Sequence, residues 1–518
     1  MNSLKNFPFH PFLFCIFPIL HLYSNNSVES QLADIFFPIL FSTSLVIVFL
    51  LLSKIFLKDL KKSPLIISIL ICMIFFYGYI YEILNFNEFF EIELKHRILL
   101  PLFSIIFIIF SVIIAKKVNS QNTNVIFNVV SITLIITLIP NLIFLDYTNF
   151  DIENNNIENE SYIINQNFYT LENPNILESE NKPNIFFIIL DGYGGTKRMI
   201  EDLKYDNYPF LDELKSREFI VSDNSHSNYP SSKWTMTSVF NMIYLPSITQ
   251  NQTDNQHSQL LSFMKQNNEV MRNLKTLNYE IIIFQPDGFF NNNYPLTDQT
   301  YCNIEHNVPT KFEQSLLRTT ILNFIITSIE VENDRTSILC GFNEAPKFLD
   351  DTNSPIFLYL HLRLPHPPYV FGANGEFVIP GEMQSEAGSF KNEKAYIDSI
   401  KFANTKVISL IDEILSKDKN SIIIIQSDHG YDFDIDYENP SSLSLKQRLS
   451  NINAVYYPFG NQVFYDGFTS VNTFRIIFND LFNAEYEILE DRMFYHPYGT
   501  SYVYKQPKFI DVTSKILN

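Results

Sequence analysis

Five long apolar stretches occupy the first 145 residues, separated by short polar segments. They cover Phe7–Tyr23, Ile35–Phe56, Pro64–Ile83, Ile98–Ala115 and Val125–Leu145. Each is close to the roughly 20 residues that a helix needs to cross the hydrocarbon core of a bilayer. We therefore predict five transmembrane helices. The first is expected to be retained rather than cleaved as a signal peptide, because no small-residue cleavage site follows it.

The charges between these stretches predict their orientation. Lysines gather in the loops after the second and fourth stretches (residues 54–62 and 116–117), whereas the alternate loops (29–34 and 88–93) are acidic. Because positively charged loops stay in the cytoplasm, we predict an inner amino terminus and an extracytoplasmic carboxyl-terminal part. The protein is then expected to be a multi-pass protein of the cytoplasmic membrane.

After residue 182, short apolar runs alternate with amphipathic stretches. Strands are predicted at Asn184–Leu190, Tyr279–Phe284, Pro355–His361, Ile422–Gln426 and Ala454–Tyr457. Helices are predicted between them, among them Tyr208–Arg217, Leu260–Leu277 and Glu393–Leu415. This alternation is typical of βαβ units around a mostly parallel sheet. The expected domains are a transmembrane part (1–145), an Asn- and Glu-rich linker (146–182) and an extracytoplasmic α/β domain (183–518).

Acidic residues follow two of the predicted strands. Asp191 comes directly after Leu190, and Asp428 with His429 follows Gln426 after one serine. Ligands of open α/β sheets bind beyond the carboxyl ends of the strands, so we expect these three side chains to meet at one edge. Two carboxylates and an imidazole gathered there indicate a divalent metal site.

Charge is divided unevenly between the two parts of the chain. Residues 1–145 carry nine Lys and Arg against seven Asp and Glu, and the rest carries 28 against 49, so the net charge of −19 divides into +2 and −21. So acidic a domain argues against a nucleic-acid partner, because phosphate backbones are bound by basic surfaces. Cys302 and Cys340 fall in the acidic part, where a disulfide is permitted but the spacing does not establish one.

Further residues carry candidate chemistry. Ser232 and Thr235 lie in a hydroxyl-rich segment before an apolar helical run, where the helix dipole and a nearby cation favour an alkoxide nucleophile. Most such clusters are only helix caps, which is the competing interpretation. His366, flanked by prolines after the third strand, is a candidate for binding an anionic oxygen or protonating a leaving group. Arg448 is a candidate anion contact because of its fork of donors.

Taken in order, these segments resemble the alkaline phosphatase superfamily: strand-Asp191-Gly, a hydroxyl-rich segment, His366-Pro-Pro-Tyr, and Ser-Asp428-His429-Gly. With its apolar stretches, the chain is similar to the membrane-anchored sulfatase-like branch, which includes lipoteichoic acid synthases and phosphoethanolamine transferases. The resemblance implies five amino-terminal spans and an outer catalytic domain. That domain is expected to be an alkaline-phosphatase-like α/β/α sandwich.

The resemblance also implies roles for individual residues. Asp191, Asp428 and His429 match metal ligands of the family. The family nucleophile is usually a threonine followed three residues later by a serine. Ser232, with Thr235 three residues on, fits that spacing and is expected to be both nucleophile and metal ligand. Thr235 is the second choice.

Other positions are expected to contact the substrate. His366 matches a histidine that lies near the transferred group, and Lys233, His361 and Arg448 are the expected substrate-binding residues. Arylsulfatases require a Cys/Ser-x-Pro/Ala-x-Arg sequence for conversion to formylglycine. No such sequence surrounds Ser232, so sulfate-ester hydrolysis is not the first expectation.

The resemblance implies an enzyme that acts on phosphoric or sulfuric esters. We expect a transferase that moves a phospho-head-group, of phosphoglycerol or phosphoethanolamine type, from a membrane lipid to an envelope glycan or lipid through a phosphoserine. The alternatives are a hydrolase of sulfate or phosphate esters and a non-catalytic protein that kept the fold. One divalent ion is expected: Mn or Zn is typical of the branch, and Mg or Ca is compatible with oxygen ligands.

Overall fold

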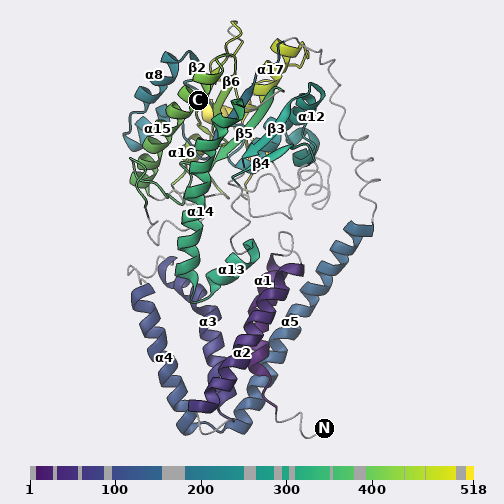
Figure 1. Cartoon of the computed structure of the whole chain (residues 1–518), viewed down its shortest axis with the longest axis vertical. Coiled ribbons are helices and arrows are strands. Elements are labelled where there is room, and N and C mark those ends of the chain that lie inside the picture. The colour runs from purple at the N-terminus through teal and green to yellow at the C-terminus, as the bar shows by residue number, and fades with distance from the viewer. Residues whose placement is uncertain are drawn as a thin grey trace. The chain divides into compact units, whose positions relative to one another are not determined.

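The chain folds into two compact units. The first comprises Met1–Glu160 with Glu305–Glu330, and the second Ser161–Ile304 with Val331–Asn518. Segment 305–330 thus leaves the second unit, joins the first and returns, which the sequence patterns did not indicate. The computed structural model (Figure 1) describes residues 7–26, 32–56, 61–86, 96–154, 181–249, 264–284, 295–302, 310–350, 354–378, 392–433, 435–436, 438–460, 463–497 and 509–517.

Long apolar helices build the first unit. They are α1 (His10–Asn25), α2 (Phe36–Phe56), α3 (Ser63–Phe86), α4 (His96–Lys117) and α5 (Ser120–Asn154). Within the part of the chain that the structure describes, four stretches are long and apolar enough to cross a membrane, namely Leu32–Ser53, Ser63–Tyr81, His96–Lys117 and Ser120–Pro140. The first predicted span is also a helix, but α1 has 16 residues with Pro18 inside it, fewer than the roughly 20 that a span needs.

The exposed side chains of these helices are largely apolar. Ile55, for example, is 75% exposed and Ile108 is 58% exposed. Soluble proteins rarely expose apolar patches of this extent, so the first unit has the surface that is typical of a membrane protein. Most of the loop residues that predicted the orientation (27–31, 57–60 and 87–95) lie outside the described residues.

One boundary differs from its prediction. Helix α5 continues to Asn154 and so includes nine residues, 146–154, that we assigned to the linker. Adding residues to an existing helix costs much less than nucleating a new one, so the residues that follow Leu145 remain helical. The remainder of the predicted linker, residues 155–180, lies outside the described residues.

A seven-stranded sheet forms the centre of the second unit, in the order β2-β7-β6-β1-β5-β3-β4. Its strands are β1 (Ile185–Leu190), β2 (Phe219–Val221), β3 (Glu280–Phe284), β4 (Gln299–Tyr301), β5 (Ile356–Leu362), β6 (Ile422–Gln426) and β7 (Asn453–Tyr456). The five predicted strands are confirmed. The two that were missed, β2 and β4, are three-residue edge strands. Only β7 pairs antiparallel with its neighbours β6 and β2, which confirms a mostly parallel sheet.

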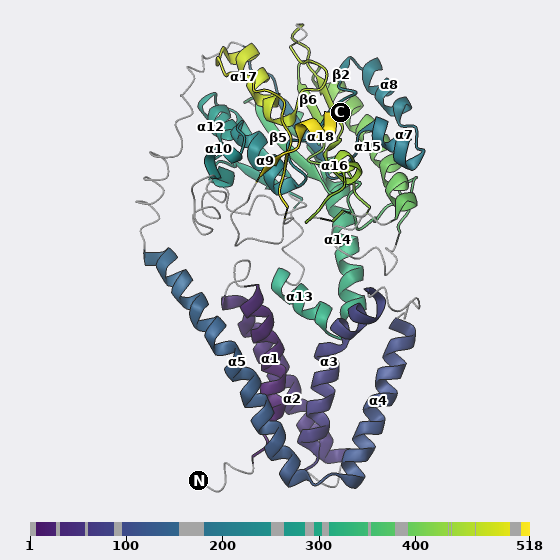
Figure 2. The ribbon, with the colours of Figure 1, turned by 180° about the vertical axis from the view of Figure 1, so that it is seen from behind.

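Helices cover both faces of this sheet (Figures 1 and 2). Alternate residues of β1 enter different cores: Phe186 and Ile188 pack with one set of helices, and Ile185 and Phe187 with the other. The first set is α7 (Thr196–Leu203), α8 (Tyr208–Ser216) and α15 (Glu393–Lys417), and the second is α9 (Ser232–Asn241), α12 (Glu269–Thr276) and α17 (Thr473–Phe482). Successive side chains of a strand point to opposite faces, so β1 belongs to both cores. The predicted α/β/α sandwich is confirmed.

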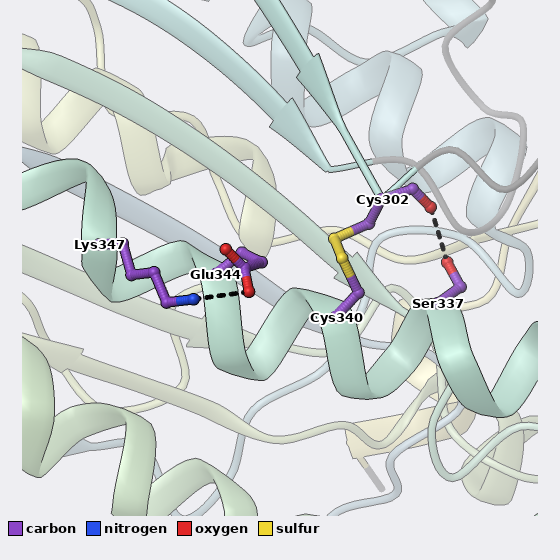
Figure 3. The surroundings of a disulfide bond; sticks show 5 residues. All are labelled: Cys302, Ser337, Cys340, Glu344 and Lys347. Atoms are coloured by element: carbon purple, nitrogen blue, oxygen red, sulfur yellow. Dashed lines mark hydrogen bonds and ion pairs between the residues drawn. A yellow bond between two sulfur atoms is a disulfide. The ribbon is translucent and has the colours of Figure 1, made fainter.

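Cys302 and Cys340 form a disulfide (Figure 3). Cys302 follows β4 directly, Cys340 lies in α14 (Asn323–Glu344), and their Cα atoms are 5.8 Å apart. The hydroxyl of Ser337 donates to the carbonyl of Cys302 at 3.1 Å. Disulfides persist in oxidising compartments, so this pair, which the spacing left open, supports an extracytoplasmic second unit.

Candidate active site

Three adjacent central strands bring the predicted metal ligands together. In the order β6-β1-β5, the parallel pairing sets Leu190 of β1 beside Leu362 of β5, and Ile189 beside Gln426 of β6. The carboxyl ends of the strands therefore meet at one edge. Asp191 follows β1 and Asp428 follows β6 at that edge, as the strand pattern predicted.

Five side chains of ligand type converge there. Asp191, His361 and Asp428 form one group, and Asp191, His366 and His429 form a second, with ligand atoms within 4.8 Å of one another in each. His429 Nε2 lies 3.6 Å from Asp191 Oδ1 and 3.5 Å from Asp428 Oδ2. The three protein ligands predicted from the strand ends thus lie together. His361, predicted to bind substrate, lies among the metal-ligating groups, 3.6 Å from Asp191 Oδ2.

Backbone donors orient the carboxylate of Asp428. Its Oδ1 accepts from the N–H groups of Gly192 at 3.1 Å and His429 at 2.9 Å. Gly192 has φ +73°, a conformation that side chains other than glycine rarely adopt, which explains the glycine after Asp191. With Oδ1 held in this way, Oδ2 faces the histidines of the cluster.

Hydrogen bonds also set the tautomers of two histidines. The Nδ1–H of His429 donates to the carbonyl of Gly430 at 2.9 Å, and that of His366 donates to Pro367 at 2.7 Å. A carbonyl only accepts, so in both histidines Nδ1 carries the proton and Nε2 carries the lone pair. Position 430 requires glycine on steric grounds, because a Cβ there would lie 2.1 Å from the carbonyl oxygen of Gln447.

The cluster holds its members in the protonation states that a metal requires. Burial by itself would raise the pKa of Asp191, but His366, His361 and His429 together hold this pKa well below its usual range. Burial lowers the pKa of His366 to about 4, against the opposing effect of Asp191. Burial and the Arg448 guanidinium lower the pKa of His429. At neutral pH the Asp191 carboxylate is charged and the imidazoles of His366 and His429 are neutral.

A divalent cation fits this set of donors. Asp191 Oδ1 and Asp428 Oδ2 are buried and have no hydrogen-bond partner among the described residues. Asp191 is 7% and Asp428 0% exposed. Two buried carboxylates side by side are costly unless a cation or donors compensate them. Oxygen and imidazole donors suit divalent ions such as Mn or Zn, so these residues support a divalent metal site.

The candidate nucleophile stands at the start of α9. Ser232 is the first residue of that helix and is partly exposed, while the capping position is held by Ser231, whose side chain makes no cap hydrogen bond. Ser232 is therefore not the helix cap that the competing interpretation assumed. Thr235, the second choice, is buried, and its hydroxyl donates to the Tyr229 carbonyl at 3.0 Å. The Thr235 hydroxyl is therefore already engaged in a hydrogen bond with the segment that precedes α9.

Arg448 links the segment that precedes Ser232 to His429 of the metal-ligand cluster. Its Nε donates to the Pro230 carbonyl at 2.7 Å, and its Nη2 lies 3.2 Å from His429 Nε2. Its Nη1 pairs with Asp432 at 2.9 Å, and both side chains are almost fully buried. These contacts are all with protein groups, and the substrate contact expected of Arg448 stays a prediction.

Two residues after Ser232, Trp234 belongs to a buried aromatic cluster that the sequence patterns did not reveal. The ammonium of Lys233 lies 5.1 Å from the ring centroid of Trp234. The His496 ring stacks on Trp234 with centroids 5.9 Å apart. Burial lowers the pKa of His496. Sequence reasoning had no signal for His496, because it is a single histidine more than 260 residues from Ser232.

The Sulfatase family model matches residues 183–476. The match covers more than half of the chain, which therefore belongs to the sulfatase family. The predicted alkaline phosphatase superfamily is confirmed, and the protein is an enzyme that acts on phosphoric or sulfuric esters. None of the curated proteins matches the chain.

Several solved structures are similar over the second unit. The C-terminal periplasmic domain of EcEptC from Escherichia coli, in complex with Zn, is 13% identical, with 66% of this chain and 96% of that chain covered and a TM-score of 0.43. The corresponding domain of the phosphoethanolamine transferase EptC from Campylobacter jejuni is 11% identical, with 61% and 94% covered and a TM-score of 0.37. The 2-O GAG sulfatase BT1596 is 14% identical, with 59% and 72% covered and a TM-score of 0.37. These similarities are distant, and the family assignment depends on the sulfatase match.

Proposed function

We propose that the protein is a membrane-bound, metal-dependent transferase. It moves a phospho-head-group, of phosphoglycerol or phosphoethanolamine type, from a lipid to an envelope glycan or lipid acceptor. In this proposal residues 1–145 span the cytoplasmic membrane several times and 146–182 are the linker. Residues 183–518 form the extracytoplasmic catalytic domain, apart from segment 305–330, which folds with the first unit. The observation that carries it is the junction made by Arg448, which contacts both Pro230, two residues before Ser232, and His429 of the metal cluster.

The residues act in two steps. Ser232 Oγ attacks the phosphorus of the donor, and the bond from phosphorus to the lipid oxygen breaks as the serine ester forms. His366, neutral at Nε2, accepts the serine proton and passes it to the departing oxygen. In the second step an acceptor hydroxyl gives its proton to His366 and attacks the phosphorus of the phosphoserine. The bond from phosphorus to Ser232 Oγ breaks, and His366 returns the proton to that oxygen, which frees Ser232. A divalent ion held by Asp191, Asp428 and His429, with Ser232 as a further ligand, would stabilise negative charge on the transferred group.

The membrane unit favours a lipid donor. A site tethered at the bilayer meets lipid head groups at a high effective concentration, which raises the rate of transfer without any additional contact. Residues 146–518 carry a net charge of −21, from 28 Lys and Arg against 49 Asp and Glu, which disfavours nucleic acid as a partner.

The test uses the full chain in lipid nanodiscs that contain head-group-labelled donors. Ser232→Ala should lower transfer by at least about a thousandfold and abolish a phosphoserine detected by mass spectrometry, whereas the neighbouring Ser231→Ala should keep both. Transfer that survives in Ser232→Ala would refute the mechanism. Loss of transfer in Ser231→Ala alone would identify Ser231, and not Ser232, as the nucleophile.

The second candidate is a hydrolase of sulfate or phosphate esters, which the match to the sulfatase family model favours. Aryl sulfate, aryl phosphate and labelled lipid should be assayed side by side on the same preparation. Turnover of the soluble esters without any transfer from lipid would establish hydrolysis in place of the transferase.

A further inference from the structure

Two helical elements of segment 305–330 belong to the first unit, which we call the membrane unit. Helix α13 (Lys311–Thr319) and the first turns of α14 form a hairpin (Figure 2) within Glu305–Glu330. Phe312 and Leu316 of α13 are buried in the core that contains Cys15 of α1. The Cys302–Cys340 disulfide of the second unit joins residues 38 apart, on either side of segment 305–330.

The tip of the hairpin docks directly on helix α3. The backbone N–H of Ile321 donates to the carbonyl of Ile74 at 3.1 Å. A Cβ added to Gly78 would lie 1.9 Å from the carbonyl oxygen of Arg318, so only glycine permits this approach. Ile74 lies seven residues before Tyr81, where the apolar span of α3 ends. At 1.5 Å per residue, the contact lies about 10 Å inside that end of the span.

The turn between α13 and α14 satisfies its polar groups internally. Its side-chain hydrogen bonds run from Thr319 Oγ1 to Leu316 O at 2.8 Å, from Thr320 Oγ1 to Leu317 O at 2.7 Å, and from Asn323 Nδ2 to Arg318 O at 2.7 Å. The N–H of Leu322 donates to Thr320 Oγ1 at 3.1 Å. In water, the polar groups of a turn can bond to solvent. At membrane depth they must find partners within the protein, as they do here.

Apolar side chains cover the outer surface of the tip. Leu322, Phe324, Ile325 and Ile329 are each about two-fifths exposed, and no charged residue occurs from 319 to 329. The flanking Arg318 extends its guanidinium to Glu330, at 2.6 Å. Glu330 lies seven residues after Asn323, about 10 Å along α14 from the tip. The charge is thus carried away from the apolar surface, as snorkelling arginines do at membranes.

The same surface is continuous with the lipid-facing side of the membrane helices. The Phe324 ring lies 5.9 Å from that of His96, the first residue of α4, and His96 stacks on Tyr81 with centroids 3.9 Å apart. Ile83 and Ile98, close to these rings in sequence, are exposed and apolar. Tyrosine side chains such as Tyr81 gather where the hydrocarbon core meets the head groups.

We propose that residues 319–329 insert into the lipid on the side of the membrane where the catalytic unit is attached. The hairpin tip is then a second membrane anchor of that unit, in addition to helix α5. The occupant of its apolar surface is the lipid bilayer. This inference depends on the contacts within the first unit and is independent of the reaction catalysed.

Site-directed spin labelling of the full chain in nanodiscs tests the insertion. The label is placed by Ile325→Cys in a background of Cys15→Ser and Cys72→Ser, and its accessibility to oxygen and to a nickel chelate is compared with two control positions. Ile109→Cys reports the lipid-facing side of α4, and Thr336→Cys an exposed position further along α14. The ratio of oxygen to nickel accessibility at 325 should be severalfold above that at 336 and approach that at 109.

Two outcomes would overturn the proposal. A ratio at 325 equal to that at 336 would place the tip in water, and low accessibility to both reagents would mean that protein covers it. The docking on α3 is tested by adding Gly78→Val, which should shift the label towards the value at 336. The adjacent and exposed Tyr79→Val should not. A label that keeps its lipid depth in Gly78→Val would show that this contact does not hold the tip.

Discussion

Removing the Cys302–Cys340 disulfide should destabilise the catalytic unit by an amount that its loop length sets. The half-cystines are 38 residues apart. In the chain-entropy model a closed loop of that size contributes about 13 cal/mol/K, or roughly 4 kcal/mol at 25 °C. With a urea slope of about 3 kcal/mol per molar, the double variant Cys302→Ser/Cys340→Ser should lose about 1.3 M in its unfolding midpoint.

The chain offers a selective reporter for this measurement. It contains one tryptophan, Trp234, which is buried in the second unit, so intrinsic tryptophan fluorescence follows that unit alone. Reductant should lower the midpoint of the unmodified chain by the same amount and leave that of the double variant unchanged. Cys72→Ser, in the membrane unit, is the matched control. An unchanged midpoint in the double variant, with an unchanged slope, would refute the entropic argument for this pair.

Three further changes are followed by the same fluorescence. Arg448→Met should cost about 3–5 kcal/mol, because it leaves the buried Asp432 carboxylate without its partner, and adding Asp432→Asn should recover part of this loss. The midpoint should fall as the pH drops from about 6.5 to about 4, since burial holds the pKa values of His366 and His429 below normal and the unfolded state then binds the extra protons; a flat profile would contradict this. A chelator should lower the midpoint and strip the metal measured by mass spectrometry, whereas Asp428→Asn should show neither response.

The strands of the central sheet and the residues at their ends were predictable because the signal is local. A buried parallel strand is a nearly continuous apolar run, and its carboxyl end lies where the site forms, so Asp191 and Asp428 could be placed without any tertiary information. His361 shows the limit of this reasoning. It lies inside the apolar run of β5, and nothing local distinguishes a buried ligand from a substrate contact there.

Other features depend on contacts between distant segments, which no periodicity encodes. The three-residue strands β2 and β4 are shorter than any window in which alternation can be detected. Segment 305–330 resembles any other helical piece of an α/β domain, and its place in the membrane unit follows from Gly78 and Ile74, more than 200 residues earlier. The register of Ser231 and Ser232 at the start of α9 likewise emerges only once the helix is formed.

One measurement tests both the lipid donor of the proposed transferase and the membrane insertion of the hairpin tip, and distinguishes the failure of one from that of the other. If the hairpin tip holds the catalytic unit at the bilayer, Phe324→Asn with Ile325→Asn should lower head-group transfer from lipid by at least about tenfold, because the effective concentration of donor falls. Turnover of a soluble phosphate ester should not change, since these residues lie outside the candidate site. Leu443→Asn, at an exposed apolar position of the second unit, is the matched control. Equal losses on both substrates would mean that the variant disturbs the fold, and unchanged transfer from lipid would show that the tip does not govern access to the donor.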